Sequence, residues 1–112
     1  MYIIEKTFTV SAAHRLELDY ESPCQNWHGH NWRITVTCES PKLDGNSMVI
    51  DFKTIKQLVE KRLDHSILNE ELHGMNPTAE NIARWITEII PYCVRAAVQE
   101  TEGSVAVYDT RI

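Results

Sequence analysis

A cysteine and three histidines form the group of side chains best suited to chemistry in this chain. Cys24 precedes the segment His28-Gly29-His30, and His14 lies upstream. In an extended segment, side chains two residues apart share a face, so His28 and His30 can bind one ion; we expect Gly29 to let the backbone bend between them. Three neutral imidazoles are a familiar ligand set for catalytic zinc, because they leave the fourth position open for water or substrate. The nearby thiol could serve as a nucleophile or a base.

Asp64 and His65 form a second pair of titratable side chains, directly after an expected helix. A carboxylate beside an imidazole can fix its tautomer and stabilise its protonated form, so His65 is a candidate proton carrier. Neighbours in sequence need not touch, and an exposed pair at a helix end is the alternative interpretation.

Glu100 and Thr78 are candidates for holding a ligand. Glu100 shares one face of an expected strand with Ala96 and Val98, and a lone charge on an apolar face needs a partner or a ligand unless the strand end is open to solvent. Thr78 could contact a bound ring, although capping of the following helix already explains a threonine at this position.

The composition is that of one globular domain over residues 1–112, with 43% hydrophobic and 24% charged residues. A net charge of -5 gives no overall field that attracts nucleic acid. The N-terminal residues alternate in polarity and no apolar run reaches membrane-spanning length, so we expect neither a secretory signal nor a membrane partner. Three cysteines without regular spacing indicate free thiols in a reducing cytoplasm, with Cys38 and Cys93 buried as small apolar side chains.

The periodicity of the apolar residues predicts an α+β fold with the order ββααββ. The expected elements are a strand over 2–14, a strand over 30–39, a helix capped by Asp51 and running to 63, a loop over 64–76, a helix capped by Asn76 or Thr78 and ended by Pro91, and a hairpin over 94–101 and 104–111. The four strands should form an antiparallel sheet with both helices on one face. A threonine-rich face and both sheet edges then stay open, which favours edge-to-edge assembly into a closed barrel.

Five short motifs occur in order along nearly the whole chain. They are Ala12-Ala13-His14-Arg15, Cys24-x3-His28-Gly29-His30, Leu63-Asp64-His65-x2-Leu68-Asn69, Asn76-Pro77-Thr78-x-Glu80 and Glu100-Thr101. Each is weak evidence alone, but together the chain resembles the 6-pyruvoyltetrahydropterin synthase and 6-carboxytetrahydropterin synthase family.

The resemblance implies a tunnelling fold (T-fold), in which three subunits close a twelve-stranded barrel and two trimers stack into a homohexamer with active sites at subunit interfaces. It also implies roles for individual residues. His14, His28 and His30 would bind Zn²⁺, Cys24 would be the catalytic base, Asp64 and His65 would form a second proton relay, and Glu100 and Thr78 would bind the pterin.

The family catalyses two reactions of 7,8-dihydroneopterin triphosphate. One adds water and yields 6-carboxy-5,6,7,8-tetrahydropterin, acetaldehyde and triphosphate for queuosine synthesis; the other eliminates triphosphate to give 6-pyruvoyltetrahydropterin. The short interval between Cys24 and His28 and the compact length resemble the bacterial carboxy-producing type, a zinc-dependent lyase. A noncatalytic zinc or pterin-binding module would not need Cys24, Asp64 and His65 together, so their joint presence favours an enzyme.

Overall fold

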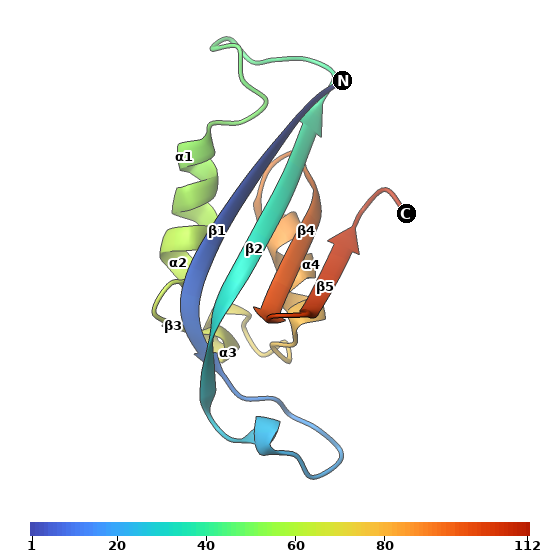
Figure 1. The fold of residues 1–112 in the computed structure, drawn as a ribbon. Helices are drawn as coiled ribbons and strands as arrows, with labels where there is room; N and C mark the ends of the chain where they lie inside the picture. Colours follow the sequence, from blue (N-terminus) through green and yellow to red (C-terminus); the bar gives the residue numbers. More distant parts are fainter.

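The computed structural model describes all 112 residues, and its central feature is one twisted sheet (Figure 1). The sheet contains five strands in the order β3-β1-β2-β4-β5. They are β1 (Tyr2–His14), β2 (His28–Ser40), β3 (Ser66–Ile67), β4 (Cys93–Thr101) and β5 (Ser104–Asp109). The four long strands pair antiparallel as expected, whereas the short β3 pairs parallel to β1 and adds a fifth strand that the sequence pattern did not predict.

The long hairpin of β1 and β2 sets the two faces of the sheet. Phe8 lies opposite Ile34 and both are buried, while the neighbouring pair Thr7 and Thr35 lies on the other face, with its hydroxyl oxygens 2.9 Å apart. The expected threonine-rich face is therefore present. Thr37 is the exception: it is buried and donates to the Glu5 carboxylate at 3.0 Å. β2 begins at residue 28 rather than 30, because the register continues without a break through both strand ends.

The first predicted helix is present, but its middle turn is wider than an α-helix. It comprises α1 (Phe52–Ile55), the π turn η2 (Lys56–Glu60) and α2 (Lys61–Leu63), and the Asp51 carboxylate caps its start by accepting from the Lys53 amide at 2.9 Å. Ile55, Val59 and Leu63 are fully buried, whereas Phe52 at the start of the helix is exposed. The four-residue spacing of the three buried side chains decides which face meets the sheet.

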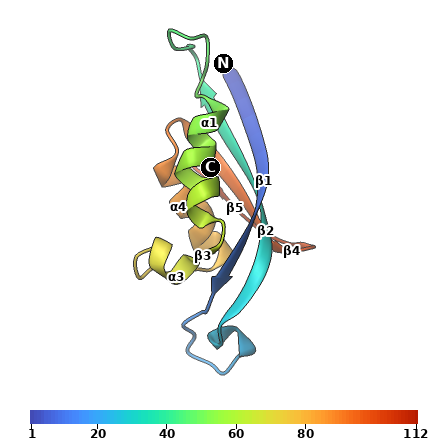
Figure 2. The ribbon, with the colours of Figure 1, turned by 90° about the vertical axis from the view of Figure 1, so that its left-hand side faces the viewer.

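The second predicted helix is α4 (Ala79–Ile89), and it lies with the first on one side of the sheet (Figure 2). The Thr78 hydroxyl accepts from the Asn81 amide at 3.2 Å, so the cap of α4 is Thr78 and not Asn76. The expected loop over 64–76 contains β3 and the short helix α3 (Leu68–Glu71), because Leu68 and Leu72 reach the core.

Two of the three free cysteines face each other across the sheet. Cys38 on β2 pairs with Cys93 on β4, and both are buried as expected, whereas Cys24 is half-buried. A hydrogen bond with Cys93, together with burial, raises the pKa of the Cys38 thiol. Both side chains therefore belong to the apolar core.

The sheet does not close on itself within one chain. The outer edge of β5 carries Val105 and Val107 with exposed fractions of 54% and 47%. The molecule measures 51 × 29 × 26 Å, and its radius of gyration of 14.7 Å exceeds the value of about 13 Å expected for a compact domain of this size. An open edge of this kind is a template for pairing with another chain. None of the helices is both long enough and apolar enough to cross a membrane.

Candidate metal centre and active site

The three histidines predicted as metal ligands meet at one end of the β1–β2 hairpin. His14 and His28 are direct partners across the two strands, and His30 follows two residues later on the same face. Their ring centroids are 4.5 to 5.3 Å apart, and one nitrogen from each ring lies within 4.8 Å of the other two. Gly29 continues the regular register opposite Ala13, so the backbone bend expected there is absent and alternation alone brings the rings together.

Backbone carbonyls orient two of the rings. Nδ1 of His14 lies 2.8 Å from the Pro77 carbonyl oxygen, and Nδ1 of His28 lies 2.7 Å from that of Asn26. A carbonyl oxygen only accepts, so both Nδ1 atoms donate and each Nε2 keeps a free lone pair, as in metal-binding histidines.

The Nε2 atoms of His14 and His30 are buried and have no hydrogen-bond partner. Buried polar atoms are rarely left in this state, and a metal ion would satisfy both. Burial also lowers the pKa of His14, which favours the neutral imidazole that binds metals. The residues present therefore fit a metal ion held by nitrogen ligands.

Trp32 forms a rigid wall behind the histidines. Its indole ring meets His14 and His30 edge to face, with centroids 4.9 and 5.1 Å away, and its Nε1 donates to the Ala12 carbonyl oxygen at 3.1 Å. Alternation along β2 indicates only that Trp32 lies on the apolar face of the strand. The structure gives this core residue a direct part in positioning two of the rings.

Glu100 lies beside the histidines, on the apolar face where its strand parity places it. Its two carboxylate oxygens are 3.6 Å from Nε2 of His30 and 4.0 Å from Nε2 of His14. Glu100 and Thr78 also line one cavity of about 400 Å³, together with Leu16 and residues of the β4–β5 turn. The two predicted ligand-binding residues thus share a space that borders the candidate metal centre.

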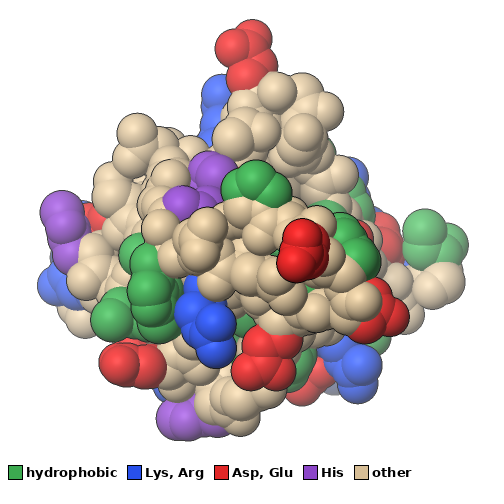
Figure 3. Space-filling view, turned by 90° about the horizontal axis from the view of Figure 1, so that it is seen from below, with side chains coloured by type: hydrophobic (Ala, Val, Ile, Leu, Met, Phe, Trp, Pro, Cys, Tyr) green, Lys and Arg blue, Asp and Glu red, His purple; other side chains and the backbone are tan.

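Cys24 stands in the connection between β1 and β2, at the lower end of the molecule in Figure 1. It belongs to the single turn η1 (Pro23–Gln25), which Ser22 caps, and its side chain is half-buried. The thiol is not part of the cluster of potential metal ligands. Figure 3 views this end of the protein and shows histidine side chains reaching the surface among acidic and hydrophobic groups.

Asp64 and His65 lie at the outer edge of β1. The Asp64 carboxylate accepts from the Ser11 amide at 2.8 Å, the His65 amide donates to the Ser11 carbonyl at 2.6 Å, and Nε2 of His65 is 3.7 Å from the Asp64 carboxylate. His65 has a left-handed φ of 59°, and its side chain is 84% exposed.

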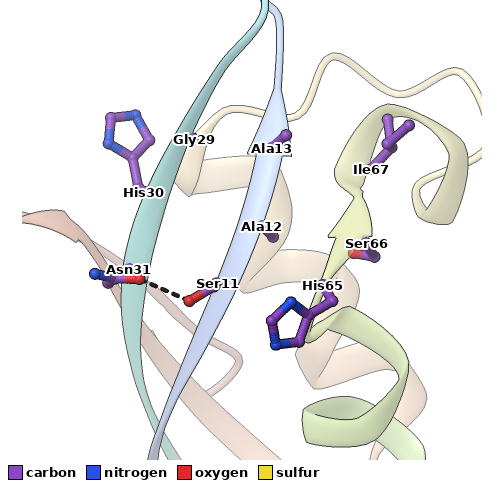
Figure 4. Close-up of a pocket in the computed structure, with 9 residues that line it drawn as sticks. All are labelled: Ser11, Ala12, Ala13, Gly29, His30, Asn31, His65, Ser66 and Ile67. Carbon is purple, nitrogen blue, oxygen red and sulfur yellow. Dashed lines mark hydrogen bonds between the residues drawn. The ribbon is translucent and has the colours of Figure 1, made fainter.

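His65 does not meet the histidine cluster within one chain. Figure 4 shows the rings of His65 and His30 on opposite sides of the β1–β2 ribbon, at the two flanks of a surface cavity of about 570 Å³. The contact between Asp64 and His65 is present, but the His65 side chain is largely exposed.

The fold and the histidine cluster define this chain as a T-fold protein with a centre positioned to bind a metal. The family model "6-pyruvoyl tetrahydropterin synthase" matches residues 3–111. The 6-carboxy-5,6,7,8-tetrahydropterin synthase of Synechocystis sp. is 40% identical over 94 residues, which cover 77% of this chain and 72% of that protein. The enzyme of the same name from Bacillus subtilis is 28% identical, with 94% of this chain and 83% of that protein covered.

The solved structures agree with this relationship. The 6-pyruvoyl tetrahydropterin synthase of Caenorhabditis elegans superposes with a TM-score of 0.74 at 24% identity, covering 96% of this chain and 94% of that one, a level of identity that supports the fold alone. The chain belongs to the 6-pyruvoyl tetrahydropterin synthase family. Its fold class is therefore the one expected from the five sequence motifs.

Proposed function

We propose that this protein is a zinc-dependent carbon–carbon lyase. It converts 7,8-dihydroneopterin triphosphate and water to 6-carboxy-5,6,7,8-tetrahydropterin, acetaldehyde and triphosphate, in the cytoplasm and in the synthesis of queuosine. The observation that carries the proposal is the pair of unpartnered Nε2 atoms beside the cavity that holds Glu100. The names of the Synechocystis and Bacillus subtilis relatives support the carboxy product over the 6-pyruvoyl product.

His14, His28 and His30 would hold the zinc ion. When bound, the ion would polarise a substrate oxygen and lower the pKa of a coordinated hydroxyl group. The carbonyls of Pro77 and Asn26 keep two of the rings in the tautomer that binds it. Trp32 excludes water from the buried side of the rings.

Glu100 and Thr78 would hold the pterin. A carboxylate accepts two parallel hydrogen bonds from the amino-pyrimidinone edge of the ring. Because Glu100 is within 4.0 Å of two of the histidines, a ring anchored there lies next to the metal centre. The substrate side chain then extends toward the zinc ligands.

Cys24, Asp64 and His65 would move protons. Cys24 follows the histidine-bearing strand β1 in a turn that leaves its thiol partly accessible, as a base acting on bound substrate must be. The outward-facing pair of Asp64 and His65 would complete the site of a neighbouring subunit, with the carboxylate stabilising the imidazolium form of His65. Shared sites of this kind require assembly.

The reaction is tested by incubating zinc-loaded protein with 7,8-dihydroneopterin triphosphate and identifying the products by mass spectrometry. Formation of 6-carboxy-5,6,7,8-tetrahydropterin with acetaldehyde supports the proposal. A 6-pyruvoyltetrahydropterin product assigns the alternative family reaction, and the recovery of unchanged substrate indicates a binding module.

Replacing Glu100 with glutamine should weaken substrate binding. The amide keeps one acceptor oxygen and loses the charge, and hydrogen bonds to charged groups contribute about 1.5–3 kcal/mol, so KM should rise roughly 10-fold or more. Zinc content should stay at the wild-type level in elemental analysis. Glu102→Gln, in the exposed β4–β5 turn, is the matched control and should leave KM unchanged. Loss of zinc from Glu100→Gln would instead make Glu100 a metal ligand.

The protein should assemble as a dimer of trimers, because edge pairing of β5 would close three sheets into a barrel. Light scattering should give the mass of six 12.9 kDa chains. Val107→Lys places a charge on the exposed edge strand and should shift the protein to smaller, less active species. A fully active monomer at micromolar concentration would contradict both the barrel and the shared sites.

A further inference from the structure

Two asparagines bind the backbone of the segment that follows His14. The Asn69 amide group donates to the Arg15 carbonyl at 2.8 Å and accepts from the Arg15 amide at 3.0 Å. Asn76 makes the same pair of bonds with Glu17, both at 3.0 Å. Each side chain thus occupies both hydrogen-bonding groups of one residue, as a neighbouring β-strand would.

The other edge of the same segment binds the turn that contains Cys24. The Leu16 amide donates to the Cys24 carbonyl at 2.9 Å, and the Gln25 side chain donates to the Leu18 carbonyl at 2.9 Å. Backbone groups of successive residues in an extended chain point to opposite edges, so residues 15 and 17 face the two asparagines while residues 16 and 18 face the cysteine turn. The segment 15–18 therefore connects the two asparagines to the turn that contains Cys24.

Both asparagines are themselves fixed to the body of the protein. Asn69 belongs to α3, which begins at the buried Leu68. The Asn76 carbonyl accepts from the Asn81 side chain of α4 at 2.9 Å, and the next residue, Pro77, supplies the carbonyl that orients His14. The helices, the His14 ring and the Cys24 turn are therefore linked through two amide side chains.

We infer that Asn69 and Asn76 are positioning residues that set the place of the Cys24 thiol relative to the histidine cluster. The inference rests on the proposed function in that Cys24 is taken as the proton-transferring group. Asparagine suits the task because it offers one donor and one acceptor at a fixed spacing, whereas aspartate lacks the donor. Without the side-chain hydrogen bonds of Asn69 and Asn76, the segment 15–18 is no longer held along one edge. The turn that contains Cys24, which binds the other edge, is then displaced with it.

The test uses Asn69→Asp and Asn76→Asp, which keep the side-chain size and remove the donor. A misplacement of about 1 Å costs on the order of 100-fold in rate, so kcat should fall by about that factor while KM stays within about twofold and zinc is retained. In metal-free protein, iodoacetamide should alkylate Cys24 several-fold faster than in the wild type, measured by mass spectrometry of the 16–33 tryptic region. Asn69→Gln and Asn76→Gln, which keep both hydrogen-bonding groups, should recover part of kcat.

Val59→Ala is the control for general loss of stability. It removes two methyl groups from the core at the η2 turn and leaves the hydrogen bonds of Asn69 and Asn76 in place. It should lower the melting temperature without changing Cys24 alkylation. An unchanged alkylation rate in both aspartate variants would overturn the inference, whether or not kcat falls. If the wild type does not turn over the pterin but Cys24 is alkylated faster in the aspartate variants, the positioning role of the two asparagines is supported and the proposed function is contradicted.

Discussion

Replacement of Cys24 by alanine should abolish turnover and leave both zinc and assembly intact. The three histidines are the residues positioned to bind a metal, and the thiol is not in their cluster, so coordination should not need it. Proton transfer by one positioned group contributes about 100-fold to 10,000-fold, and kcat should fall at least that far. The variant should still bind substrate, because Glu100 and the three histidines remain. Steady-state kinetics, elemental analysis and light scattering measure the three properties.

Cys93→Ala is the control for Cys24→Ala, because it removes a thiol that is buried at the opposite end of the sheet. It should keep turnover at the wild-type level after a modest loss of stability. Release of zinc from Cys24→Ala would make the thiol a ligand. Normal turnover in that variant would place the base elsewhere.

Replacement of His28 by alanine should remove most of the bound zinc and, with it, the activity. Loss of an outer-shell partner typically reduces metal affinity 10- to 100-fold, and loss of a direct ligand should exceed about 100-fold. Elemental analysis after dialysis measures the zinc per subunit. His73→Ala changes an exposed loop histidine and should keep full occupancy. Full zinc in His28→Ala would remove His28 from the centre.

Strand parity in the sequence favours the clustering of the three histidines, and the structure brings them together. In β1, His14 has the same strand parity as Val10 and Ala12. In β2, His28 and His30 have the same parity as Trp32. One antiparallel pairing of the two strands is therefore enough to place three rings on one face. The same argument placed Glu100 on the apolar face of its own strand, and the structure brings it beside two of the histidines. It could not give the ring orientations, because these depend on the carbonyls of Pro77 and Asn26, and every residue has a carbonyl.

The parts of the fold that sequence patterns missed are short and depend on distant contacts. β3 has two residues and forms where the Asp64 carboxylate and the His65 amide bind the backbone of Ser11 on the edge of β1. The apolar residues around the π turn η2 have the spacing of an α-helix, so the sequence pattern does not distinguish this turn from the α-helix around it. The exposed position of the His65 side chain likewise depends on contacts at the edge of β1. Its place next to Asp64 in the sequence therefore did not reveal which site it faces.

The buried pair Cys38 and Cys93 gives this protein a built-in reporter of cooperative unfolding. Both thiols belong to the core, Cys38 with no exposed surface and Cys93 with 8%, so rapid labelling requires β2 and β4 to separate. When the strands reclose faster than the thiols react, the labelling rate divided by that of a free thiol gives the population of the open state, and from it the free energy of opening of the central strands follows. Cys24 in the same sample reports only local accessibility. One mass-spectrometric time course therefore separates damage to the scaffold from a displacement within the active site.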